Sequence, residues 1–82
     1  MTVITLYTRP GCHLCDEARD AIVALREEVA RFELREVNIE QDDGLLARYL
    51  ERIPVVEVDG ETVSELDLDL DLLRGVLDTV WR

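Results

Sequence analysis

The two cysteines of this chain lie two residues apart, between a strand-like segment and a helix-like segment. They are Cys12 and Cys15, in the turn-rich stretch Thr8–Cys15. Before them, Val3–Tyr7 is short, apolar and rich in β-formers, which predicts a buried strand. After them, apolar residues recur three and four apart, which predicts an amphipathic helix over residues 12–30. The first cysteine is therefore expected at a helix N-terminus, where unpaired N–H groups and the helix dipole favour a thiolate.

The rest of the chain continues to alternate between strand-like and helix-like patterns. Expected strands are residues 32–37, 55–58 and 61–63, and expected helices are residues 45–50 and 66–80. Pro54 separates a helix from a strand, because a proline disfavours helix in the residue before it. Asp59-Gly60 is typical of a tight hairpin turn. The order β-α-β-α-β-β-α predicts an α/β domain, with helices on both faces of a four-stranded mixed sheet.

The last of these segments carries two overlapping patterns. Asp and Leu alternate over residues 65–72, and a period of two also suits a strand. The apolar spacing of three and four continues to residue 80, so we interpret the segment as a helix that begins near Leu66. Its leucines are then expected in the core, and Ser64, Asp67 or Asp69 is expected to cap it.

Composition bounds the class of protein. Eighty-two residues suffice for one hydrophobic core, so we expect a single domain over residues 1–82. The net charge of −10 disfavours binding to nucleic acid, whose phosphates the chain would repel. The apolar runs are too short to span a membrane, and no basic and apolar leader opens the sequence. We therefore expect a cytoplasmic monomer whose close cysteines serve catalysis or metal binding rather than a structural staple.

The combination of these motifs resembles a known fold. Cys-x-x-Cys after the first strand, with Ile53-Pro54 before the third, resembles the thioredoxin fold, and the short chain resembles the glutaredoxin family within it. The resemblance covers the whole chain and is strongest over Tyr7–Cys15 and Arg52–Gly60. Cys-x-x-Cys alone is a weak signal. In register with the proline-preceded strand and the Asp-Gly hairpin it becomes strong.

The resemblance implies roles for five residues. Cys12 is the nucleophile and Cys15 is the resolving thiol. Arg9 matches a basic position that stabilises the thiolate and binds a substrate carboxylate. Pro54 matches a cis-proline beside the dithiol, and a cis bond before proline costs only about 0.5–1 kcal/mol. It presents the backbone N–H and C=O of Ile53 to a bound peptide, which pairs as a short added strand.

Three further residues are candidates, each with a plainer alternative. Tyr7 ends the first strand and either lines the dithiol cleft or fills the core. Arg52 precedes the Ile-Pro pair and either binds a substrate carboxylate or is a surface arginine without a function. His13 either tunes the pKa of Cys12 or is only a polar residue at a helix start. The helix dipole disfavours its cationic form, whereas a neighbouring thiolate favours that form.

Two departures from the family pattern bear on the reducing partner. The residues between the cysteines are His13-Leu14, where the family usually has Pro-Tyr, and this changes the redox potential. After its hairpin the family carries Gly-Gly, a small residue and Asp-Asp, which hold the γ-glutamyl end of glutathione. Residues 64–68 here read Ser-Glu-Leu-Asp-Leu. Side chains at Ser64 and Glu65 are expected to crowd and repel a carboxylate of glutathione.

These observations predict a thiol–disulfide oxidoreductase without a cofactor or a metal. Its substrate is a disulfide-containing protein or a low-molecular-weight thiol, and its electrons come from an external thiol or a reductase. Two alternatives stay open: an iron–sulfur or zinc protein that uses Cys12 and Cys15 across a dimer, and a redox-inactive interaction adaptor. A copper chaperone is disfavoured, because it needs the order β-α-β-β-α-β and usually a methionine just before the cysteines, whereas Met1 is the only methionine.

Overall fold

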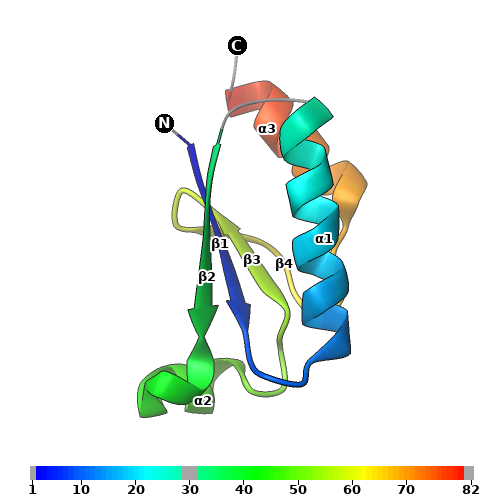
Figure 1. Cartoon of the computed structure of the whole chain (residues 1–82). Helices are drawn as coiled ribbons and strands as arrows, with labels where there is room; N and C mark the ends of the chain where they lie inside the picture. The colour runs from blue at the N-terminus through cyan, green and yellow to red at the C-terminus, as the bar shows by residue number, and fades with distance from the viewer. Residues whose placement is uncertain (1, 29–31, 81–82) are drawn as a thin grey trace.

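A four-stranded mixed sheet organises the protein (Figure 1). In the computed structural model, which describes residues 2–28 and 32–80, the strands are β1 (Thr2–Thr8), β2 (Phe32–Asn38), β3 (Val55–Val58) and β4 (Glu61–Ser64). The strand order is β2-β1-β3-β4. β1 pairs in parallel with β2 and antiparallel with β3, and β3 pairs antiparallel with β4. The predicted mixed sheet is confirmed.

Three α-helices complete the predicted order. They are α1 (His13–Glu28), α2 (Asp43–Tyr49) and α3 (Leu70–Val80), and a single 3-10 turn, η1 (Ile39–Gln41), precedes α2. The sequence did not predict η1, and α2 begins two residues before its predicted start. Its N-cap is Asp42, whose carboxylate accepts hydrogen bonds from the N–H groups of Gly44 and Leu45. The predicted end of the first helix at residue 30 lies outside the described residues.

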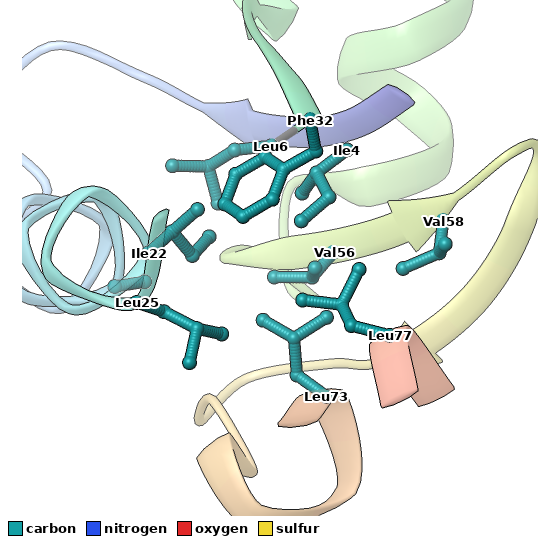
Figure 2. Close-up of a cluster of buried hydrophobic side chains, with 10 residues drawn as sticks. Ile4, Leu6, Ile22, Leu25, Phe32, Val56, Val58, Leu73 and Leu77 are labelled. Atoms are coloured by element: carbon teal, nitrogen blue, oxygen red, sulfur yellow. The ribbon is translucent and has the colours of Figure 1, made fainter. Parts of the chain in front are cut away.

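Helices cover both faces of the sheet because alternate strand residues point to opposite faces. Ile4 and Leu6 of β1 and Val56 of β3 contribute to the main core cluster, beneath α1 and α3 (Figure 2). The helices supply the other half of that cluster, with Ile22 and Leu25 from α1 and Leu73 and Leu77 from α3. On the opposite face, α2 packs over a second, smaller cluster formed by Ile39, Tyr49 and Val55.

The start of α3 differs from the prediction. The helix begins at Leu70 rather than at Leu66, because the carboxylate of Asp69 accepts a hydrogen bond from the N–H of Leu72 at 3.0 Å and so caps the first turn. Asp69 was one of the three predicted caps. Leu66 has a left-handed backbone (φ 68°) and is 55% exposed, so it does not lie in the core. The segment between β4 and α3 is therefore an irregular loop that carries an exposed leucine.

The hairpin turn between β3 and β4 follows its prediction. Asp59 and Gly60 both have positive φ angles, 50° and 89°, which is the geometry that Asp-Gly favours in a tight turn of this kind. The Asp59 carboxylate also accepts a hydrogen bond from the N–H of Val3 at 2.9 Å. The turn thereby ties the edge hairpin to the beginning of the central strand. Within the described ranges, no helix is long and apolar enough to cross a membrane.

Removal of a core side chain from α3 tests how this helix faces the sheet. Leu73 is fully buried in the main cluster, whereas its neighbour Leu72 is 48% exposed. We expect Leu73→Ala to lower the free energy of unfolding by about 2–5 kcal/mol, since it removes buried contacts and leaves a cavity. Leu72→Ala, the matched control, should change it by about 0.5 kcal/mol or less. Urea denaturation followed by circular dichroism measures both, and equal losses would contradict the described orientation of α3.

Candidate functional site

The dithiol lies where the chain passes from the central strand β1 into α1. After Thr8 the chain turns through Pro10-Gly11, and Gly11 has a φ of 80°, which is accessible to glycine without strain. The N–H of Cys12 donates to the carbonyl of Arg9 at 3.3 Å and closes this turn. The turn places Cys12 immediately before the first residue of α1. The predicted position of the first cysteine at a helix N-terminus is confirmed.

Cys12 and Cys15 are joined by a disulfide bond, and their Cα atoms are 5.2 Å apart. Their exposures differ: Cys12 is partly exposed, while Cys15 is only 1% exposed. An incoming nucleophile or substrate disulfide can therefore reach the sulfur of Cys12 but not that of Cys15. This asymmetry matches the roles of nucleophile for Cys12 and resolving thiol for Cys15 that the family resemblance implies.

The start of α1 supplies positive potential to the outer sulfur. The N–H of Cys15 donates to Sγ of Cys12 at 3.2 Å, and the N–H of Asp16 donates to the carbonyl of Cys12 at 3.2 Å. Cys12 therefore occupies the N-cap position of the helix, with its side chain toward the free N–H groups of the first turn. In the reduced protein these dipoles stabilise negative charge on Sγ, which is the form of cysteine that attacks disulfides.

The two residues predicted to tune Cys12 both contact carboxylates. Nη2 of Arg9 lies 2.9 Å from Oε2 of Glu40 in η1. Nε2 of His13 lies 3.4 Å from Oε1 of Glu17, one turn further along α1, and the imidazole is exposed. The structure thus directs both side chains to acidic partners, so a tuning role for either residue stays a prediction.

The Ile53–Pro54 peptide bond is cis, as the resemblance implies, and it lies beside the dithiol turn. It lies there because Tyr7, near the end of β1, pairs with Val55 at the start of β3. The segments that follow β1 and precede β3 therefore meet at one end of the sheet (Figure 1). Half of one expectation for this segment is wrong. The N–H of Ile53 donates to the carbonyl of Tyr49 at 3.0 Å, at the end of α2, so it is not free to pair with a bound peptide. Pairing through the C=O of Ile53 stays a prediction.

Arg52 forms an internal ion pair that links the cis-proline segment to the loop after β4. Its guanidinium binds both carboxylate oxygens of Glu65, with Nε at 3.0 Å from Oε2. Its carbonyl accepts a hydrogen bond from the N–H of Leu66 at 2.8 Å, and its guanidinium lies 5.7 Å from the centre of the Tyr49 ring. The hydrogen bond from Arg52 lowers the pKa of Glu65 and raises that of Arg52 itself.

This ion pair changes two sequence-based expectations. Arg52 was a candidate for binding a substrate carboxylate, and the structure gives it a carboxylate of the same chain instead. Glu65 was expected to repel a glutathione carboxylate, yet its charge is offset by Arg52. The sequence placed these residues on either side of a hairpin but offered no signal of their pairing other than their opposite charges.

Tyr7 belongs to the packing beneath α2. Its ring stacks on that of Tyr49, with centroids 4.6 Å apart, and it packs against the second core cluster. Its hydroxyl donates to Oε1 of Glu57 at 3.0 Å. Burial and the contact with Glu57 raise the pKa of Tyr7 to about 12, so the phenol stays neutral at pH 7. These contacts fit the alternative in which Tyr7 fills the core. A contact between Tyr7 and a substrate stays a prediction.

The chain resembles known proteins along nearly its whole length. It matches the Glutaredoxin-like domain family (DUF836) over residues 3–78. The Glutaredoxin-like protein YDR286C homolog of Dictyostelium discoideum is 30% identical over 84 residues, which cover 96% of this chain and 78% of that relative. Within the residues that the structure describes, no three His, Cys, Asp or Glu side chains are grouped so as to hold a metal ion.

Solved structures agree with this assignment. Protein Ne2328 from Nitrosomonas europaea has a TM-score of 0.79 at 28% identity, and the match covers 92% of this chain and 89% of that one. A mutant thioredoxin from Halobacterium salinarum has a TM-score of 0.67 at 20% identity over 95% of this chain and 73% of its own, which shows the fold alone. The chain therefore has a thioredoxin-like fold and belongs to the Glutaredoxin-like domain family.

Proposed function

We infer that the protein is a thiol–disulfide oxidoreductase that works through Cys12 and Cys15. The observation that carries this proposal is the disulfide between a partly exposed cysteine at a helix N-terminus and a buried one in the next turn. Membership of a glutaredoxin-like family supports the same chemistry. A metal or cluster shared between two chains would need the reduced thiols rather than the disulfide, and it stays an alternative.

The reaction proceeds by two thiol–disulfide exchanges. The Cys12 thiolate attacks one sulfur of a substrate disulfide, the substrate S–S bond breaks, and the departing thiolate takes up a proton. The Cys15 thiol then loses its proton and attacks Sγ of Cys12, which releases the second substrate thiol and forms the Cys12–Cys15 bond. Two electrons pass from the protein to the substrate, with one proton from Cys15 and one from solvent, because Cys12 attacks as a thiolate. An external thiol or a reductase returns them, and sulfur carries the electrons without a cofactor.

The burial of Cys15 makes the second exchange an internal step. Its sulfur is bonded to that of Cys12 in the oxidised protein. Cys15 lies on the side of α1 that faces the core, so it is shielded from solvent. A thiol that the fold holds beside Cys12 reacts with it far faster than the same thiol free in solution, because the entropy of bringing the two sulfurs together is already lost. A mixed disulfide on Cys12 is therefore short-lived when Cys15 is present.

Replacement of each cysteine separates the two steps. We expect Cys12→Ser to abolish reduction of a disulfide substrate, since no accessible nucleophile remains. We expect Cys15→Ser to react once and to accumulate a mixed disulfide on Cys12, which mass spectrometry of the intact protein detects as an adduct. Circular dichroism checks that both variants are folded. Turnover retained in Cys12→Ser would overturn the mechanism.

The loop after β4 bears on the identity of the reductant. We propose that glutathione is a poor reductant and that another small thiol or a thioredoxin-reductase-type enzyme resets the disulfide. Arg52, the cation nearest the cis-proline in sequence, already holds the Glu65 carboxylate, and the N–H of Leu66 already donates to Arg52. A small anionic thiol that approaches this loop meets a cation and an N–H group that are already paired with other residues of the chain.

A comparison of reductants tests this proposal. The oxidised protein is offered glutathione with glutathione reductase, other small thiols, and thioredoxin reductase, and NADPH consumption or free thiol is followed. Wild type should be recycled slowly by glutathione, whereas Glu65→Ala frees Arg52 and should raise the glutathione-dependent rate by about threefold or more, the scale of one exposed ion pair. Glu61→Ala, a control on β4, should leave that rate unchanged. Fast recycling of wild type by glutathione alone would refute the proposal.

A further inference from the structure

A groove runs along the first turns of α1, beside the loop that leads into α3. Its volume is about 260 Å³. Its floor is apolar and includes Leu14 and Ala18 from α1 with Leu68 and Leu70 from the segment opposite. Leu14 lies between the two cysteines in sequence and is 50% exposed. The groove therefore includes a residue that adjoins Cys15 in sequence, and it offers apolar surface to a bound chain.

The rim of this groove is acidic. Glu17 and Asp67 also line it, and no arginine among the described residues does. The carboxylate of Glu17 meets only the imidazole of His13, at 3.4 Å, and Asp67 is exposed. Arg9 and Arg52, the arginines of the neighbouring loops, are held by Glu40 and Glu65 and do not offset these charges. A ligand that fills the groove must therefore combine apolar and positive groups.

We propose that this groove binds a segment of a protein substrate in which an apolar side chain, flanked by Lys or Arg, lies close to the cysteine of the disulfide attacked by Cys12. The inference rests on the proposed function and specifies its substrate class. The lining residues of α1 span about 10 Å along the helix axis, and an extended chain advances about 3.3 Å per residue. The apolar residue of the substrate therefore lies about two to four positions from its reactive cysteine.

Two other occupants fit the groove less well. A second copy of this chain would bring its own acidic rim against Glu17 and Asp67, and each copy carries a net charge of −10. A small anionic thiol would be repelled by the same carboxylates and would leave most of the apolar floor uncovered. Basic and apolar residues on a protein segment satisfy both features of the groove at once.

Single-turnover reduction of designed peptides tests the inference. Each peptide carries one cysteine joined to mercaptoethanol by a disulfide, and the pre-reduced protein converts it to two thiols while forming its own Cys12–Cys15 bond. The basic peptide has a leucine and two lysines within four residues of the cysteine, the acidic peptide has glutamates in place of the lysines, and a third peptide has serine in place of the leucine. At low salt we expect the basic peptide to react roughly tenfold faster than the acidic peptide, with a smaller difference at high salt. Serine for leucine should slow the reaction.

Variants of the rim locate the preference in the groove. Glu17→Gln with Asp67→Asn should lower the ratio of basic to acidic rate constants by roughly three- to tenfold, as expected for two exposed ion pairs. Glu36→Gln with Glu61→Gln makes the same change in charge on β2 and β4, outside the groove, and should preserve the ratio. A ratio near one in wild type, or an equal fall in both double variants, would overturn the inference.

Two controls separate this inference from the proposed function. The symmetrical disulfide of mercaptoethanol is small and neutral, so its reduction by wild type and not by Cys12→Ser tests the chemistry without the groove. If wild type reduces it but shows no preference among peptides, the groove inference fails and the proposed function stands. If wild type reduces no disulfide at all, the proposed function fails. A wild-type dimer in sedimentation that Leu14→Ser dissociates would assign the groove to a second copy and overturn the inference.

Discussion

The pairing of β1 with both of its neighbours determines where the reactive sulfurs lie. The parallel pairing with β2 requires a crossover, and α1 supplies it, so the chain leaves β1 at Thr8 and turns into a helix at His13. The antiparallel pairing with β3 brings the cis-proline segment to the same end of the sheet. A slip of one residue in β1 would exchange Leu6, which faces the main core, with Tyr7, which faces α2. The packing on both faces of the sheet thus determines the register of β1, and that register determines where the two cysteines lie.

The same packing divides the work between the two cysteines. Cys15 lies on the buried side of α1, in line with Ala18 and Ile22, so its sulfur is held by contacts that also stabilise the domain. Cys12 precedes the helix and is partly exposed, and its sulfur receives the dipole of the first turn. One short segment therefore supplies a partly exposed sulfur at a helix N-terminus and a buried sulfur bonded to it.

Much of the fold could be predicted because local patterns encode it. Strand alternation, the Asp-Gly turn and the proline boundary are each properties of a few adjacent residues, and the structure confirms them. The start of α3 was misplaced because Asp-Leu alternation over residues 65–72 satisfies two periodicities, and only the cap at Asp69 decides between them. Leu66 was assigned to the core on the same grounds and is exposed.

The site was predicted less completely because its charges pair across the fold. The position of Cys12 at a helix N-terminus was predicted from the local pattern, whereas the burial of Cys15 was not predicted and comes from the face of α1 on which it lies. The ion pairs of Arg9 with Glu40 and of Arg52 with Glu65 join residues from different elements, so no local pattern contains them. The N–H of Ile53 is likewise used by the last turn of α2, which a sequence pattern does not place beside it.

Leu66 shows how these contacts shape the surface beside the dithiol. Its left-handed backbone (φ 68°) costs a residue with a side chain about 1–2 kcal/mol relative to an ordinary conformation. Its N–H donates to the carbonyl of Arg52, and the adjoining Glu65 binds the guanidinium of the same residue, so two contacts with one arginine hold the loop in this form. The result is an exposed leucine directly before Asp67 on the rim of the groove. The ion pair that occupies Arg52 therefore also holds apolar surface beside an acidic edge, and both effects support the proposed preference for a basic, apolar protein segment over a small anionic thiol.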